Sequence, residues 1–421
     1  MKSFLSKIII NRHFMRIWGA QICSLVSAYT LNFVLIGRVF SATQSTVAVS
    51  LFLFLYYLPT LVLGPFVGVL VDNLSKRKIF IYSNLLQAII VLAYLGVKGR
   101  VWPLYGIVFV YSLCDEFFNP AVGAILPALV KKEKLTIANS LFFITSQGSI
   151  VIGALLGGLI MKFTNSLEAV FITASGLLLL ATLLSWLLPK KPLAGSQKIK
   201  FDLRNPNSLG KAFALPAFWQ QTKQGYAFIK NEPRVLFPIV LLSGLQAIVA
   251  MGLIILPPLA GLLRINFADT SYLVITPVIV GVIVGSLILN KKSKNNRKNV
   301  IVIKGLFLMG ASLLAVSLVT AFTSQLAQGV AVLLTLLLGV SFVLMIVPLQ
   351  TLLQQSTPFD VRGRVFGALN TGINLVSLAP LLLSATLIDI FGLRFVLVLG
   401  GAGFLALSIV AQKKKAMVLR G

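Results

Sequence analysis

Residues 47–78 read VAVSLFLFLYYLPTLVLGPFVGVLVDNLSKRK. No charged residue occurs from Val47 to Val71, and three consecutive bases, Lys76 to Lys78, follow after a short turn. A helix needs about 20 apolar residues to cross the hydrocarbon core of a bilayer, where only a helix satisfies its own backbone hydrogen bonds. The stretch therefore predicts a transmembrane helix that ends in a basic loop.

The composition of the whole chain indicates a membrane protein. Its 421 residues are 57% hydrophobic and only 11% charged, with a mean hydropathy of +0.95, whereas a soluble domain is about 25% charged. The sequence predicts an all-α membrane fold. It has twelve apolar spans, at approximately 14–38, 47–71, 79–97, 102–130, 137–162, 167–188, 235–262, 270–290, 300–322, 326–352, 365–389 and 393–411.

The two halves of the chain resemble each other. A shift of 228 residues places Pro120 on Pro348 and Phe163 on Phe391, and the order of features repeats. Two six-helix halves around a pathway, with the binding site near the midplane, are a known transporter plan. We expect an N-terminal bundle over 1–188, a middle loop with a short amphipathic helix over 189–234, and a C-terminal bundle with a basic tail over 235–421.

The formal net charge is +27, and the Lys and Arg residues gather in alternate loops. With the N-terminus in the cytoplasm, 30 of the 37 fall in the cytoplasmic loops and terminal segments, as the positive-inside rule requires. Their position therefore indicates orientation in a membrane rather than nucleic-acid binding. We expect a multi-pass protein of the cell's inner (plasma) membrane with both termini in the cytoplasm.

Two adjacent carboxyl groups, Asp115 and Glu116, lie deep in the fourth span. A charge at the centre of a bilayer costs at least roughly 2.5–3.5 kcal/mol, so intramembrane acids usually have a function. Burial disfavours the charged form of a carboxyl group, as a reversible proton carrier requires, and the spans place no base beside this pair. We interpret Asp115 or Glu116 as a proton-coupling residue; the alternative is a structural carboxyl paired with a neighbouring helix.

The loop after the second span carries a recognisable pattern, formed by Gly68, Asp72 and the bases Lys76, Arg77 and Lys78. It resembles the signature loop of the major facilitator superfamily, although Asn73 and Ser75 replace a base and a glycine. The resemblance implies the major facilitator fold, with two pseudo-symmetric six-helix bundles. It also implies that this loop gates the cytoplasmic side, and Arg362 and Arg364 are interpreted as latch residues that face Asp72 or lipid phosphate.

Other phrases resemble the macrolide-efflux-like, drug-exporting branch of that superfamily. They are Phe118-Asn119-Pro120, Lys223-Gln-Gly225-Tyr226 and Arg362-Gly363-Arg364. In the fifth span the small residues Gly148, Gly153, Gly157 and Gly158 resemble the antiporter signature of the superfamily, with Ala154 in place of its proline. Close packing of helices explains these glycines equally well.

Polar residues within the spans are candidates for a substrate cavity. Each alone could instead form a hydrogen bond between helices. As a set they indicate a mildly polar, weakly charged cavity suited to a hydrophobic or amphipathic solute. The candidates are Tyr29, Asn32, Asn119, Gln147, Gln246, Asn370 and Asn374.

Together these features and the resemblance predict a secondary active transporter that works by alternating access and exports a hydrophobic or amphipathic small molecule, such as a drug or macrolide, in exchange for protons. We expect a monomer with the proton gradient as its energy source, a small hydrophobic or amphipathic substrate, and no cofactor, metal or nucleic acid. The alternatives are a lysophospholipid transporter and, in another class, a non-transporting receptor or scaffold. Enzyme chemistry is not expected, because the sequence has no nucleotide-binding loop or nucleophile with a nearby base.

Overall fold

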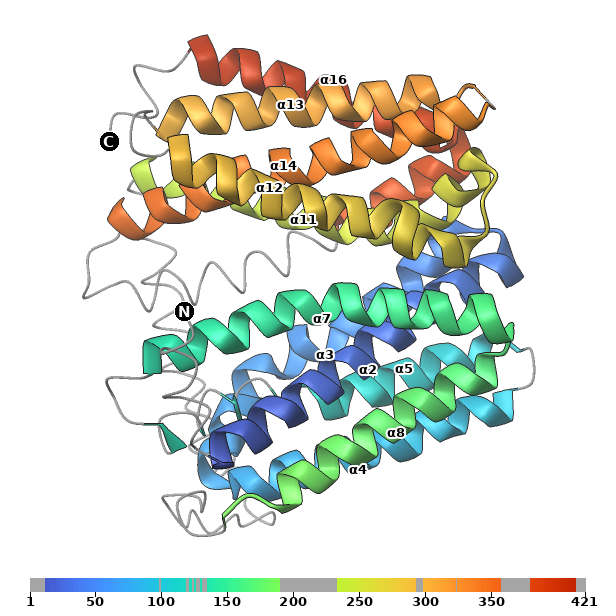
Figure 1. Ribbon diagram of the computed structural model, residues 1–421, viewed down its shortest axis with the longest axis vertical. Helices are drawn as coiled ribbons and strands as arrows, with labels where there is room; N and C mark the ends of the chain where they lie inside the picture. The colour runs from blue at the N-terminus through green and yellow to red at the C-terminus, as the bar shows by residue number, and fades with distance from the viewer. Residues whose placement is uncertain are drawn as a thin grey trace. The chain divides into compact units, whose positions relative to one another are not determined.

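The computed structural model describes ten parts of the chain, and these parts are helical with short turns and contain no strand (Figure 1). The expected middle loop 189–234 lies outside the described residues except at its ends. The parts are 12–97, 100–118, 121–122, 125, 129–130, 135–189, 233–292, 298–322, 324–356 and 379–413.

Each of the twelve predicted spans contains a helix, which confirms the all-α membrane fold. Among the described residues, nine helices are long and apolar enough to cross a membrane, and Met251–Leu263 and Ala379–Phe391 are shorter apolar helices. The helices are α2 (Arg12–Thr43), α3 (Thr46–Asn73), α4 (Lys76–Ala93), α5 (Trp102–Asp115), α7 (Leu135–Thr164), α8 (Leu167–Trp186), α11 (Pro233–Leu263), α12 (Thr276–Lys292), α13 (Lys298–Val319), α14 (Gln325–Ser356), Ala379–Phe391 and α16 (Leu393–Lys413).

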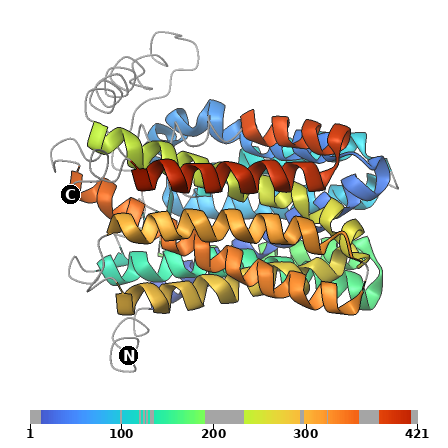
Figure 2. The same ribbon diagram turned by 90° about the horizontal axis from the view of Figure 1, so that it is seen from above.

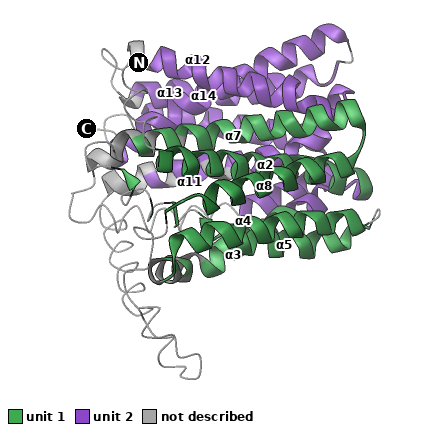
Figure 3. Ribbon diagram, turned by 60° about the horizontal axis from the view of Figure 1, so that its bottom comes forward, with its two compact units in different colours: residues 1–42, 52–216 green, residues 43–51, 217–421 purple. Residues whose placement is uncertain are grey.

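The chain divides into two compact units (Figure 3). Unit 1 consists of Met1–Ala42 and Phe52–Pro216, and unit 2 of Thr43–Leu51 and Ala217–Gly421. The turn between α2 and α3 thus belongs to unit 2 by its contacts, although most of both helices belongs to unit 1. The expected bundle boundaries at 188 and 235 stay a prediction, because most of the chain between them is not described.

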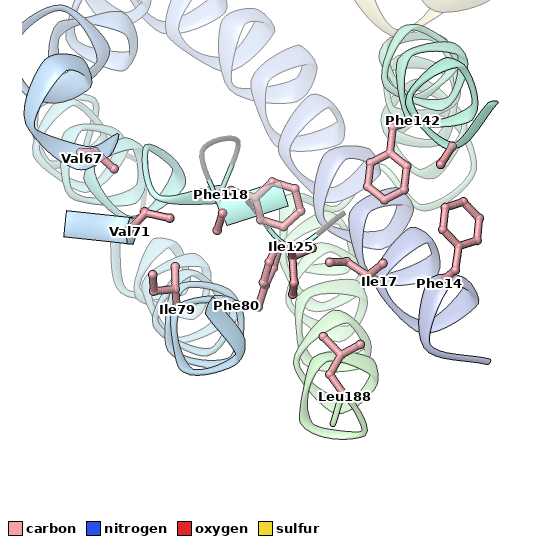
Figure 4. Close-up of a cluster of buried hydrophobic side chains, with 12 residues drawn as sticks. Phe14, Ile17, Val67, Val71, Ile79, Phe80, Phe118, Ile125, Phe142 and Leu188 are labelled. Carbon is pink, nitrogen blue, oxygen red and sulfur yellow. The ribbon is translucent and has the colours of Figure 1, made fainter. Parts of the chain in front are cut away.

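Aromatic side chains form much of one core cluster of unit 1 (Figure 4). The rings of Phe80 on α4 and Phe118 pack edge to face with centroids 5.1 Å apart, and Phe14 on α2 meets Phe142 on α7 at 5.8 Å. Such pairs contribute about 0.5–1.5 kcal/mol beyond the area that they bury. The cluster therefore fixes the residues just after α5 against α4.

Glycines bring helices of unit 2 into backbone contact. A Cβ atom on Gly339 of α14 would lie 1.8 Å from the carbonyl oxygen of Val278 on α12, and one on Gly281 would lie 2.0 Å from that of Leu336. Helices α13 and α16 lie side by side (Figure 2), and a Cβ on Gly310 would lie 2.7 Å from the oxygen of Gly401. Small residues permit this close approach in membranes.

Four helices are followed by a residue with left-handed backbone conformation, at equivalent places in the two halves. Gln44 follows the first span and Arg264 the seventh, with φ of 51° and 53°; Asn165 follows the fifth and Gly392 the eleventh, with φ of 49° and 83°. A left-handed residue after a helix closes its last turn and lets the chain reverse. The repeat of this turn agrees with the internal similarity of the sequence.

The fourth span is interrupted, in contrast to the continuous span predicted over 102–130. Helix α5 ends at Asp115, residues 116 and 117 form a turn, and helical residues resume at Phe118. Proline has no amide hydrogen, and its ring clashes with the carbonyl group four residues earlier; for Pro120 that residue is Glu116. The proline therefore explains why the helix breaks at the acidic pair.

Candidate functional site

The acidic pair lies inside unit 1 at the end of α5. Asp115 is the last residue of this helix and Glu116 its C-cap, and both side chains are half-buried. Helix rise places Asp115 about 20 Å along the axis from Trp102 at the start of α5. The two carboxyl groups thus stand well within the predicted membrane span, at the point where its helix is interrupted.

Neighbouring helices supply neutral donors to both carboxyl groups. Gln87 Nε2 on α4 donates to Asp115 Oδ1 at 3.1 Å, and Tyr56 Oη on α3 donates to Asp115 Oδ2 at 3.4 Å. The hydroxyl group of Thr60, also on α3, donates to Glu116 Oε1. The hydrogen-bond partners that the described part of the chain gives this pair are therefore uncharged.

Helical spacing explains why these side chains converge. Tyr56 and Thr60 are four residues apart and thus share a face of α3, and this face meets the end of α5. The hydroxyl group of Ser112, one turn before Glu116, donates to the carbonyl oxygen of Tyr56 and ties the two helices together. The acidic pair is consequently held by α3 and α4 within one unit.

Tyrosines surround this network. Tyr56 on α3 donates to Asp115, and Tyr29 on α2 and Tyr111 on α5 lie in its neighbourhood. The Tyr56 and Tyr57 rings pack edge to face with centroids 5.2 Å apart. Aromatic rings with hydroxyl groups offer both apolar surface and hydrogen bonds, so the surroundings of Asp115 combine the two.

Several buried polar atoms on α4 and α5 have no hydrogen-bond partner among the described residues. They are Oε1 of Gln87, Oδ1 of Asn84 and the hydroxyl group of Tyr111. Leaving a buried polar group unpaired costs about 1–3 kcal/mol. Hydrogen-bonding capacity is thus left unused on Gln87, the residue that donates to Asp115.

Of the residues predicted to line a cavity, Tyr29 lies near the acidic pair. Asn32 is half-buried on α2, and Gln147 is exposed on α7. Gln246 belongs to α11 of unit 2, where its side chain is not described. Three others lie outside the described residues: Asn119, Asn370 and Asn374.

Two of the predicted packing glycines meet α2 directly. A Cβ on Gly153 would lie 2.6 Å from that of Tyr29, and one on Gly157 would lie 2.9 Å from Val34 Cγ2. Gly158 is buried, whereas a Cβ on Gly148 would meet no atom within 4 Å. The contact at Gly153 brings α7 against the backbone that carries Tyr29.

The predicted gating loop is described only in part. Gly68 and Asp72 belong to α3, where the side chain of Asp72 is not described, and Arg362 and Arg364 lie outside the described residues. Lys76 begins α4 and is half-buried, and Lys78 is exposed. Arg77 Nη2 donates to the carbonyl oxygen of Trp186 at 2.5 Å. Trp186 is the last residue of α8, and a basic side chain there pairs with a carbonyl group that has no partner within the helix.

Sequence reasoning missed Tyr56, Thr60, Asn84 and Gln87. The signal was present for the last two, because Asn84 and Gln87 are polar residues inside the apolar third span and both are fully buried. Buried polar groups need partners. Asn84 and Gln87 are three residues apart and therefore share one face of the helix, so this spacing indicates a polar face toward a neighbouring helix.

Sequence reasoning also missed the carboxyl group of Asp389, which lies in unit 2 near the end of the helix Ala379–Phe391. Asp389 Oδ1 accepts hydrogen bonds from Thr46 N at 2.8 Å and from Thr46 Oγ1 at 2.6 Å. Asp389 Oδ2 accepts from Ser45 Oγ at 2.6 Å and from Val47 N at 3.2 Å. Asp389 thus caps the N-terminus of α3, where the helix dipole favours a negative charge.

The asymmetry of this cap distinguishes the two halves. The residue 228 positions before Asp389 is Met161, which cannot replace a carboxylate as an acceptor. The cap is therefore specific to the turn between α2 and α3.

The paired helix-terminal turns, the helices described in each of the twelve predicted spans and the acidic pair within the fourth span define a polytopic membrane protein of the secondary-transporter class. The chain belongs to the Major Facilitator Superfamily, whose sequence profile matches residues 17–380. It is accordingly a multi-pass membrane transporter of that superfamily, as its signature loop indicated.

Sequence relatives carry names of exporters or transporters, and a solved transporter structure agrees in fold. The chain is 23% identical over 403 residues to macrolide efflux protein A of Streptococcus pyogenes, covering 94% of each chain. It is 26% identical over 392 residues to the MFS-type transporter YfiS of Bacillus subtilis (strain 168), covering 88% of this chain and 85% of YfiS. A crystal structure of a single-residue mutant of the nucleoside transporter NupG matches with a TM-score of 0.73 and 11% identity, covering 95% of this chain and 99% of NupG.

Proposed function

We propose that this protein exports hydrophobic or amphipathic small molecules in exchange for protons. The observation that supports this function best is the acidic pair Asp115 and Glu116, which stands at a helix break inside the membrane span with uncharged partners. A carboxyl group that is paired with a base stays ionised, whereas one with neutral partners can exist in both protonation states. Such a group is able to carry a proton.

Asp115 is the proposed proton carrier of the pair. It accepts from two side chains, Gln87 and Tyr56, and lies beside buried polar atoms that lack a partner among the described residues. A substrate that bound there would compete with the proton for the same small polar region. This competition couples export to proton entry, because occupancy by one favours release of the other.

The proposed substrate class follows from the surroundings of Asp115. Tyrosine rings from α2, α3 and α5 provide apolar surface and hydroxyl groups, and the ionised acid provides a negative charge. The name of the streptococcal relative, a macrolide efflux protein, gives a first probe. A macrolide such as erythromycin combines a large apolar body with an amine that a carboxylate attracts.

The proposed orientation places both termini in the cytoplasm and the protein in the inner membrane. The concentration of Lys and Arg residues in alternate loops supports it. With this orientation the membrane potential and the pH gradient both drive protons inward, and the potential contributes roughly 2.3 kcal/mol per charge per 100 mV. Export against a gradient is then energetically possible.

Transport in proteoliposomes tests the proposal. We expect a pH gradient to drive accumulation of radiolabelled erythromycin by the wild-type protein and no accumulation by Asp115→Asn/Glu116→Gln. Glu168→Gln, which removes an exposed acid at the start of α8, serves as the matched control and should transport as the wild type does. Undiminished coupling in the double variant would exclude the acidic pair.

A prior thermal-shift screen against macrolides, dyes and lysophospholipids would select the probe. Stabilisation by lysophospholipids alone would favour the lysophospholipid transporter, and binding without flux would favour a receptor.

A further inference from the structure

A groove lies on the surface of unit 1 between α4 and α5. Its volume is about 430 Å³, which is comparable to the volume of one long acyl chain. One wall is a stripe along α4 that includes Lys78, Tyr82 and Leu86, and the other wall includes Leu113 and Phe117. Residues four apart share a helix face, so the stripe runs along α4 for about 12 Å from Lys78 to Leu86.

The wall of the groove is apolar and exposed. Tyr82 is 58% exposed and Leu86 49% exposed, and Leu74 in the turn before α4 is 48% exposed. Because α4 is long and apolar enough to span a membrane, these side chains meet lipid tails rather than water. An acyl chain that fills the groove makes contacts with its walls that a lipid lying on a flat helix surface could not make.

Charge marks one end of the groove. Lys78 lies there with Ser75, next to Arg77 and Lys76 in the loop predicted to face the cytoplasm. A lysine at this level keeps its ammonium group at the headgroup layer while its stem packs on apolar surface. Basic pockets at the cytoplasmic face bind anionic headgroups, and the Ser75 hydroxyl can donate to a phosphate oxygen.

We propose that this groove binds one anionic phospholipid, with its phosphate at Lys78 and Ser75 and an acyl chain along Tyr82 and Leu86. The inference does not depend on the substrate or on proton coupling. The bound chain lies against Cys114, which lines the groove and directly precedes Asp115. The lipid therefore supports the outer face of α5 at the point where this helix ends.

Native mass spectrometry of the purified protein tests this site. After exchange into equal amounts of phosphatidylglycerol and phosphatidylcholine, we expect the wild type to retain phosphatidylglycerol about fivefold more. This factor corresponds to the roughly 1 kcal/mol by which one surface lysine attracts an anionic lipid. Lys78→Gln should remove the preference, whereas Lys76→Gln, which removes the same charge outside the groove, should keep it.

The apolar part of the site has its own variant. Leu86→Trp should lower retention of both lipids by filling the groove, whereas Ile89→Trp, on the same helix and 56% exposed outside the groove, should not. All variants should elute and unfold as the wild type does. Equal retention of both lipids by the wild type, a preference that survives Lys78→Gln, or equal effects of Leu86→Trp and Ile89→Trp would overturn the proposal.

Discussion

The acidic pair of unit 1 and Asp389 of unit 2 differ in the groups that bind them. In unit 1, Asp115 and Glu116 accept from side chains, namely an amide and two hydroxyl groups. In unit 2, Asp389 accepts from two backbone amides and two hydroxyl groups at the start of α3. A helix N-terminus stabilises a fixed negative charge, whereas neutral side-chain donors can also serve a protonated acid. The comparison supports the proposed proton carrier in unit 1 and indicates a structural role for Asp389.

The largest effect expected from this comparison is on coupling. Asp115→Asn should abolish transport that a pH gradient drives, because the amide cannot take up a proton, while the protein remains folded. Asp389→Asn should retain transport. The measurement is initial flux in proteoliposomes, with midpoints of thermal unfolding determined on the same preparations. Loss of coupling in Asp389→Asn but not in Asp115→Asn would reverse the assignment.

The next effect concerns packing in unit 2. Gly339→Ala should lower the free energy of unfolding by about 1–3 kcal/mol, because its Cβ would overlap the carbonyl oxygen of Val278 on α12. Thermal unfolding in detergent measures this loss.

Gly329→Ala on the same helix is the matched control, since its Cβ would meet no atom within 4 Å. Alanine there should leave stability unchanged or raise it by roughly 0.5–1 kcal/mol. Equal stability of the two variants would show that the backbones of α12 and α14 are farther apart than described.

A smaller loss of stability is expected at the cap of α3. Asp389→Ala should lower the free energy of unfolding by about 1 kcal/mol, the usual value of an N-cap side chain. Asp389→Asn should lose less, because its amide oxygen still accepts from Thr46 N. Chemical denaturation in mixed micelles would compare the three proteins. An unchanged free energy of unfolding in Asp389→Ala would contradict the capping role.

The smallest effect is expected for the phenol beside Asp115. Tyr56→Phe removes a single hydrogen bond of 3.4 Å, and a typical bond contributes about 1 kcal/mol, so proton-driven flux should change by about fivefold at most. Tyr57→Phe is the neighbouring control. A complete loss of flux in Tyr56→Phe would mean that this hydroxyl group takes part in proton transfer.

The sequence predicted the fold well because each span is a local property. An uncharged run such as Val47 to Val71 needs a bilayer wherever it stands in the chain, and the basic turns separate one run from the next. The break after Asp115 was not predicted, although Pro120 carried its signal, because the span was read from hydropathy alone. Pro120 lies four residues after Glu116, and this spacing within an apolar span would have indicated the helix break.

Of the candidate site, the sequence predicted the two acids but not their hydrogen-bond partners. Asp115 and Glu116 stand out as charges within an apolar run, whereas their partners Gln87, Tyr56 and Thr60 come from two other helices. Which faces of α3 and α4 meet α5 depends on tertiary packing, and hydropathy does not encode this. Asp389 was missed for a related reason, because its partners are 342 to 344 residues away in the chain.

Substrate-induced proton release tests the central claim most directly. Erythromycin added to the detergent-purified protein in weakly buffered solution should release protons, which a pH-sensitive dye would report. Wild type and Asp389→Asn should release them equally, and Asp115→Asn/Glu116→Gln should release none. Release from the double variant at the wild-type level, with the same affinity for the drug, would contradict a proton carried by the acidic pair.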